Sequence, residues 1–150
     1  MADTTLHDVR GIFHAAAASV VPELARQPES VRAEVELMVE RALAGRPPRL
    51  RRQLVTFLRV VNLLSLMRFG RRLTSLDPSR RVRLLTALQD SPVLLLRRGF
   101  WGLRTLVFLG YYTRPAAAAE IGWRARPEGW SARGLPDESA LGAREGRAPT

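Results

Sequence analysis

The sequence predicts an all-α protein, with a single domain of five to six helices followed by an extended C-terminal tail. Apolar residues recur at helical spacing along most of the chain. No alternating apolar and polar run is bounded by hairpin turns, so no sheet is expected. Proline and glycine residues separate the periodic segments. We expect the helical domain to cover residues 1–123 and the tail, partly disordered, to cover residues 124–150.

Two helices are expected in the N-terminal third. The first runs from Thr5 to Val20, because Thr5 and Asp8 have the spacing of a capping pair and Pro22 marks the exit. The second begins at Ser30 and ends near Gly45. Its spacing predicts a core face of Val31, Val35, Met38 and Ala42, and a solvent face of Arg32, Glu36, Glu40 and Arg41.

A third helix is expected from about Leu50 to Phe69, with Gly70 as its C-terminal cap. Its apolar residues form two stripes, so we expect this helix to be buried on most sides. The first stripe contains Leu54, Phe57, Leu58, Val61 and Leu64, and the second contains Val60, Leu63 and Met67.

Two further helices have strong start signals. Asp77-Pro78 combines a capping aspartate with proline at the first helical position, and Ser91-Pro92 repeats this pattern before a helix from about Val93 to Tyr112. Pro115 then begins a short alanine-rich helix that ends near Ile121-Gly122.

Composition excludes several classes of protein. The chain has 150 residues and no cysteine, which excludes disulfide scaffolds, iron–sulfur clusters and thiol catalysis. The net charge is +10, and all 24 basic residues are arginine. This usage has two interpretations, a coding bias or selection for bidentate contacts with carboxylates and phosphates. Either way the charge favours an acidic partner, a nucleic acid or an anionic membrane surface.

No catalytic, cofactor-binding or metal-binding residues can be assigned. His7 and His14 would lie about 10 Å apart along a helix, too far to share one metal ion. The carboxylates are scattered, so we expect a protein that is not an enzyme and holds no cofactor in this chain. No segment is apolar enough to cross a membrane, and Met1 to Val21 does not resemble an export signal. We therefore expect a cytoplasmic or inner-membrane-associated location.

The fifth expected helix is apolar nearly all round. One stripe contains Val93, Leu96, Phe100, Leu103 and Val107, a second Leu94, Trp101 and Phe108, and a third Leu95, Gly102 and Leu109. Either this is a central core helix whose arginines reach to water, or one apolar face meets another protein chain. Trp101 and Gly102 lie on different sides of the helix. We expect one of these sides to pack on the third helix and the other on a partner or the tail.

The segment from Ser91 to Trp130 carries a recognisable pattern. Gly99-Phe100-Trp101-Gly102-Leu103-Arg104 is followed by Gly110-Tyr111-Tyr112, Ala119-Glu120-Ile121-Gly122-Trp123 and Arg126-Pro127. This pattern resembles the C-terminal signature of the gluconate 2-dehydrogenase subunit 3 family, and a similar segment precedes the flavin domain of long-chain alcohol oxidases. The resemblance extends to Leu6–Pro22, which is similar to the family's opening helix.

The resemblance implies a small non-catalytic subunit that binds and stabilises a large FAD-dependent alcohol or sugar dehydrogenase or oxidase of the glucose–methanol–choline type. FAD is then expected in the partner. We expect the partner interface to include Phe100, Trp101, Arg104, Tyr111, Tyr112, Ile121, Trp123, Arg124, Arg126 and Trp130. Residues Arg124 to Trp130 are expected to lie along the large subunit. The alternative is a basic helical protein that binds an anionic membrane surface; nucleic acid is less favoured because the arginines are interleaved with acids.

Overall fold

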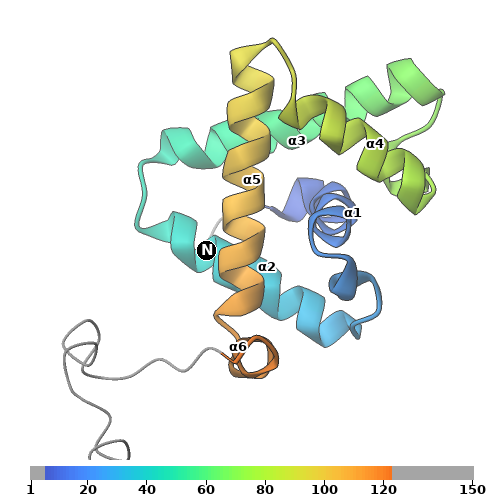
Figure 1. Cartoon of the computed structure of the whole chain (residues 1–150). Helices are drawn as coiled ribbons and strands as arrows, with labels where there is room; N and C mark the ends of the chain where they lie inside the picture. Colours follow the sequence, from blue (N-terminus) through green and yellow to red (C-terminus); the bar gives the residue numbers. More distant parts are fainter. Residues whose placement is uncertain (1–5, 123–150) are drawn as a thin grey trace, which may run out of the picture. The chain divides into compact units, whose positions relative to one another are not determined.

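The computed structural model describes residues 6–122, which contain six α-helices and three short 3-10 helices (Figure 1). The helices are α1 (Arg10–Val20), α2 (Glu29–Ala44), α3 (Pro48–Phe69), α4 (Pro78–Gln89), α5 (Leu94–Tyr112) and α6 (Pro115–Glu120). The 3-10 helices are η1 (His7–Val9), η2 (Pro22–Ala25) and η3 (Leu73–Ser75). No strand occurs in this part of the chain, which confirms the all-α prediction.

The chain divides into two compact units. The first extends to Pro115 and holds α1 to α5, and the second begins at Ala116. Of the second unit, the described residues are those of α6 after Pro115 and a turn through Ile121 and Gly122. The predicted boundary near residue 123 lies at the edge of the described residues and stays a prediction.

Helix α5 is the central element of the first unit. It crosses α2 and α3, while α1 and α4 lie beside it (Figure 1). The side of α5 that faces these helices is buried and contains Phe100, Leu103, Val107 and Tyr111. These residues meet a core supplied mainly by α1, α2 and α3, including Phe13, Val35, Val39, Leu58 and Val61.

Two glycines allow α5 to approach its neighbours closely. A Cβ atom on Gly99 would lie 2.6 Å from Cε2 and 2.8 Å from Cγ of the Phe57 ring in α3. A Cβ atom on Gly110 would lie 3.0 Å from the Val35 carbonyl oxygen in α2. The crossings of α5 with α2 and α3 therefore depend on the missing side chains at these two positions.

The predicted signals at the end of α3 and at the start of α4 are confirmed. Gly70 has φ of 66° and its N–H donates to the Leu66 carbonyl, which closes α3 with a left-handed residue. The Asp77 carboxylate caps α4 by accepting a hydrogen bond from the Arg80 N–H. The same signal at Ser91-Pro92 is wrong, because α5 begins at Leu94 with Val93 as its N-cap and Pro92 lies before the helix. The Ser91 hydroxyl oxygen instead accepts from the Val93 N–H in the preceding turn.

The N-terminal helix begins later than predicted. Residues His7–Val9 form a 3-10 turn, and the α-helix starts at Arg10. The Leu6 N–H donates to Glu40 of α2 at 2.6 Å, so a side chain from another helix holds the start of the described chain. Thr5, predicted to be a cap, lies outside the described residues.

The predicted solvent face of α2 is wrong at Glu36, and its predicted core face is rotated. The buried residues are Val35, Glu36, Val39 and Leu43. Glu36 is only 5 % exposed, because Arg10 and His14 of α1 bond to its carboxylate. Glu36 was predicted to be solvent-exposed, and its contact with α1 explains why it is buried.

The expectation that α3 is buried on most sides is also wrong. The stripe from Leu54 to Val61 is buried as predicted, but Leu63, Leu66 and Met67 are exposed, Met67 by 76 %. Only one side of α3 faces the other helices, since α5 and η3 approach it from that side. The first unit therefore carries apolar surface on α3 as well as on α5.

Candidate interaction surface

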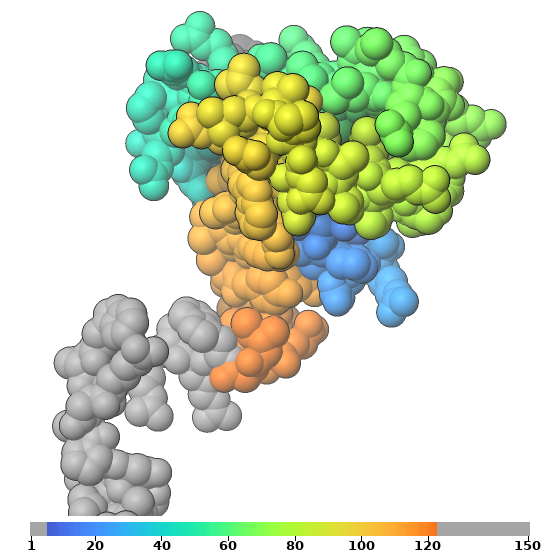
Figure 2. All heavy atoms as spheres, turned by 45° about the horizontal axis from the view of Figure 1, so that its top comes forward, coloured from blue at the N-terminus to red at the C-terminus, as the bar shows by residue number. Residues whose placement is uncertain are grey.

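The outer face of α5, on the side away from the core, is apolar and exposed. We define it by Leu94, Leu95, Trp101, Gly102 and Leu109. Leu95 is 79 % exposed, and Leu94, Trp101 and Leu109 are each between 45 and 49 % exposed. Apart from its own stretch of helix, no described residue comes within 4 Å of a Cβ placed on Gly102. Much of α5, drawn in yellow and orange, lies at the surface in Figure 2. Large exposed apolar side chains gathered on one helix face are typical of a surface that binds another chain.

Arg104 lies at the edge of this face. Its Cζ atom is 5.0 Å from the centre of the Trp101 ring and 5.1 Å from the centre of the Phe108 ring. Both are cation–π distances, and they hold the guanidinium against the helix surface. Among residues 6–122, Arg104 forms no ion pair. The structure thus presents an ordered guanidinium whose N–H donors are available to a carboxylate.

A groove of about 190 Å³ adjoins Arg104. Side chains of α1, α4 and α5 line it, and they are mixed: Val20, Val82, Leu85 and Phe100 are apolar, and Ser19, Thr86, Gln89 and Arg104 are polar. Val82 is 46 % exposed, so the apolar lining reaches the surface. The groove is large enough for one side chain of a partner and has Arg104 on its α5 side.

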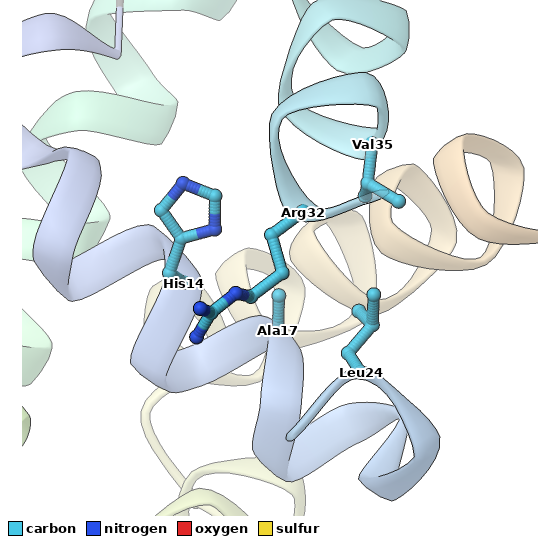
Figure 3. A pocket seen from close by; sticks show the side chains of 5 residues that line it. All are labelled: His14, Ala17, Leu24, Arg32 and Val35. Atoms are coloured by element: carbon cyan, nitrogen blue, oxygen red, sulfur yellow. The ribbon is translucent and has the colours of Figure 1, made fainter. Parts of the chain in front are cut away.

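A second depression is too small for any ligand. His14, Ala17, Leu24, Arg32 and Val35 line it where α1, η2 and α2 meet (Figure 3), and it has no room even for a water molecule. His14 Nε2 lies 2.8 Å from Glu36 Oε2, and Arg10 Nε donates to Glu36 Oε1 at 2.9 Å. This cluster connects α1 to α2 and is best explained as a structural contact.

The predicted interface residues divide into three groups. Phe100 and Tyr111 are buried in the core of the first unit, and of the two only Phe100 reaches the surface, as part of the groove lining. Trp101, Arg104 and Tyr112 are exposed or half-buried on α5, and Ile121 is 60 % exposed in the second unit. Trp123, Arg124, Arg126 and Trp130 lie outside the described residues, and so does the predicted course of the tail.

The prediction that the third helix packs on the Trp101 or the Gly102 side of α5 is wrong. Both sides are exposed, and α3 instead meets α5 at Gly99. Sequence reasoning also missed the groove, because its lining comes from three helices far apart in the chain. Gly99 could have indicated a close contact between α5 and α3. The sequence alone does not distinguish it from Gly102, which lies on the same helix and is exposed.

Two further observations concern residues 6–122. No helix in this range is both long and apolar enough to span a bilayer. No group of three or more His, Asp or Glu side chains in it is placed to bind a metal ion together.

Fold and surface together define a class: a small all-α domain with an exposed apolar and arginine-bearing face, as in a subunit of a larger complex. The family model described as gluconate 2-dehydrogenase subunit 3 matches residues 10–132. The chain therefore belongs to the gluconate 2-dehydrogenase subunit 3 family, which confirms the resemblance drawn from its C-terminal pattern. No curated protein and no solved structure matches the chain significantly.

Proposed function

We propose that this chain is a non-catalytic small subunit that binds and stabilises a large FAD-dependent alcohol or sugar dehydrogenase or oxidase. The family match over residues 10–132 carries the proposal, because the family is described as a subunit of a dehydrogenase. In this proposal the large subunit holds FAD and performs the oxidation.

The exposed side chains of α5 support a binding role. Leu95 and Trp101 are large apolar groups in contact with water, and their burial by a partner would contribute roughly 1.5–3 kcal/mol each. An aromatic residue beside an arginine, such as Trp101 beside Arg104, is a composition enriched among interface anchors. The core of the first unit is already filled by other residues, so these groups are not needed for folding.

Co-expression tests the proposal. The full chain, tagged, is produced together with a large flavoprotein of the glucose–methanol–choline type, whose gene we expect beside that of this chain, and the purified material is examined for flavin absorbance. The expected result is a yellow complex, together with a colourless small subunit when the chain is produced alone. Recovery of the tagged chain without the flavoprotein would contradict the proposal.

A salt titration separates this function from the alternative. Binding to DNA or to anionic vesicles by arginines weakens steeply as ionic strength rises. A complex that depends on apolar burial survives 0.5 M salt, because salt screens charges and strengthens rather than weakens apolar contacts. Tight vesicle or DNA binding at low salt, without flavoprotein binding, would favour the alternative. The cytoplasmic or inner-membrane location stays a prediction.

A further inference from the structure

We propose that the large subunit docks on the outer face of α5 by placing a carboxylate side chain on Arg104 and an apolar side chain in the adjoining groove. This inference rests on the proposed function and adds the place of docking and the chemistry of the partner's contact segment.

The charge around α5 selects the kind of partner. From Ser91 to Ala119 the sequence contains four arginines and no Asp or Glu. Arg114, at the C-terminal end, is already paired with Glu34 of α2 at 3.0 Å. Arg97, Arg98 and Arg104 form no ion pair among residues 6–122. Arg98 lies within this face, between Leu94 and Trp101, so a segment that covers it must carry acidic groups opposite the arginines and apolar side chains opposite the leucines and Trp101.

Arg104 differs from Arg97 and Arg98 in being held in place. The rings of Trp101 and Phe108 both lie near 5 Å from its guanidinium, whereas within residues 6–122 no ring contact is made by the other two. An arginine whose side chain is already ordered loses less conformational entropy on binding than a free one. Its planar fork also matches both oxygens of a carboxylate, which an ammonium group cannot do.

The groove supplies the apolar part of the contact. Val82 and Leu85 of α4 and Phe100 of α5 line it, and Arg104 forms part of the same wall. A volume of about 190 Å³ accommodates one side chain, since a cavity of about 150 Å³ holds a benzene molecule. An acidic residue and an apolar residue on adjacent turns of one partner segment can therefore occupy Arg104 and the groove together.

The experiment measures the affinity of the full chain for the same large flavoprotein, with each variant checked for an unchanged thermal midpoint. Arg104→Gln is expected to raise the dissociation constant about 30-fold or more, and Trp101→Ala at least about tenfold. Arg104→Lys, which keeps the charge and loses the fork, is expected to fall between wild type and Arg104→Gln. The matched control Arg41→Gln makes the same charge change at an exposed arginine of α2, away from this face, and is expected to alter affinity less than about threefold.

The possible outcomes are distinct. If the flavoprotein binds Arg104→Gln as tightly as wild type, or if Arg41→Gln weakens binding equally, docking at Arg104 is refuted while the proposed function stands. If the wild-type chain does not bind the flavoprotein, both proposals fail. If Arg104→Gln abolishes self-association of the chain and leaves flavoprotein binding unchanged, the face is covered by a second copy and the inference is overturned. Leu37→Ala, an exposed leucine on α2, serves as the control for Trp101→Ala.

Discussion

Substituting Gly99 by alanine tests the crossing of α3 and α5. Gly→Ala inside a helix gains about 1 kcal/mol of stability from propensity alone. At position 99 the new Cβ atom would lie 2.6 and 2.8 Å from two atoms of the Phe57 ring, and nearer still to Cδ2. Phe57 is buried, so its ring has no free space to enter. Overpacking of this kind costs about 1–3 kcal/mol or more.

Gly102 provides a matched control on the same helix. Among the described residues, nothing outside its own stretch of helix lies within 4 Å of a Cβ at that position, so Gly102→Ala should show only the propensity gain of about 1 kcal/mol. We expect Gly99→Ala to be less stable than Gly102→Ala by about 3 kcal/mol, or on the order of 10 °C in Tm. Urea unfolding and thermal melts, both followed by circular dichroism at 222 nm, measure the difference.

Two results would decide against this reasoning. If both alanine variants raise Tm equally, Gly99 does not lie against Phe57. If Phe57→Leu, combined with Gly99→Ala, leaves the penalty at position 99 unchanged, the penalty does not come from that ring. A double-mutant cycle with these two substitutions should instead give a coupling energy of about 1 kcal/mol or more.

Three further substitutions test the buried cluster and the helix ends. Glu36→Gln removes the charge that bonds to α1 and should lower the free energy of unfolding by about 1–3 kcal/mol in urea titrations. Gly70→Ala should cost about 1–2 kcal/mol because φ is 66° there, whereas Gly45→Ala, with ordinary φ and open space, should be neutral or slightly stabilising. Asp77→Ala should lower Tm at pH 7. The Ser79 hydroxyl donates to the Asp77 carboxylate and lowers its pKa below the ordinary 3.8. The stabilisation by the Asp77 carboxylate is therefore present above pH 3.8 and is lost as pH falls through the lowered pKa. The melting curves of variant and wild type should converge in acid.

Local signals determined the helix ends well, because each depends on one or two residues. Gly70 is left-handed as predicted, and Asp77 caps α4 as predicted. The periodicity of α3 and α5 also identified the buried stripes through Phe57 and Leu103. These features follow from the geometry of a single helix, so the neighbouring helices were not needed to predict them.

The errors arose where burial depends on a partner element. Glu36 was assigned to water because it is charged, yet Arg10 and His14 make its burial possible. Met67 was assigned to the core because α3 is apolar on two sides, yet no described helix covers that side. Helical periodicity gives the direction of a side chain but does not say what lies in that direction.

The stability of the fold depends on the inner side of α5, and the proposed docking depends on its outer face and on Arg104 at the edge of that face. Substitutions can therefore test the two separately. Gly99→Ala disturbs the inner side, but a domain stable by about 5–15 kcal/mol stays almost wholly folded after losing about 2 kcal/mol. Because apparent affinity falls only with the folded fraction, its affinity for the flavoprotein should stay within about twofold of wild type. Arg104→Gln should do the reverse, leaving Tm nearly unchanged and weakening binding. If Gly99→Ala weakened binding as strongly as Arg104→Gln, the partner would contact the inner side of α5 or require a shift of the whole helix, and the outer face would not be the docking surface.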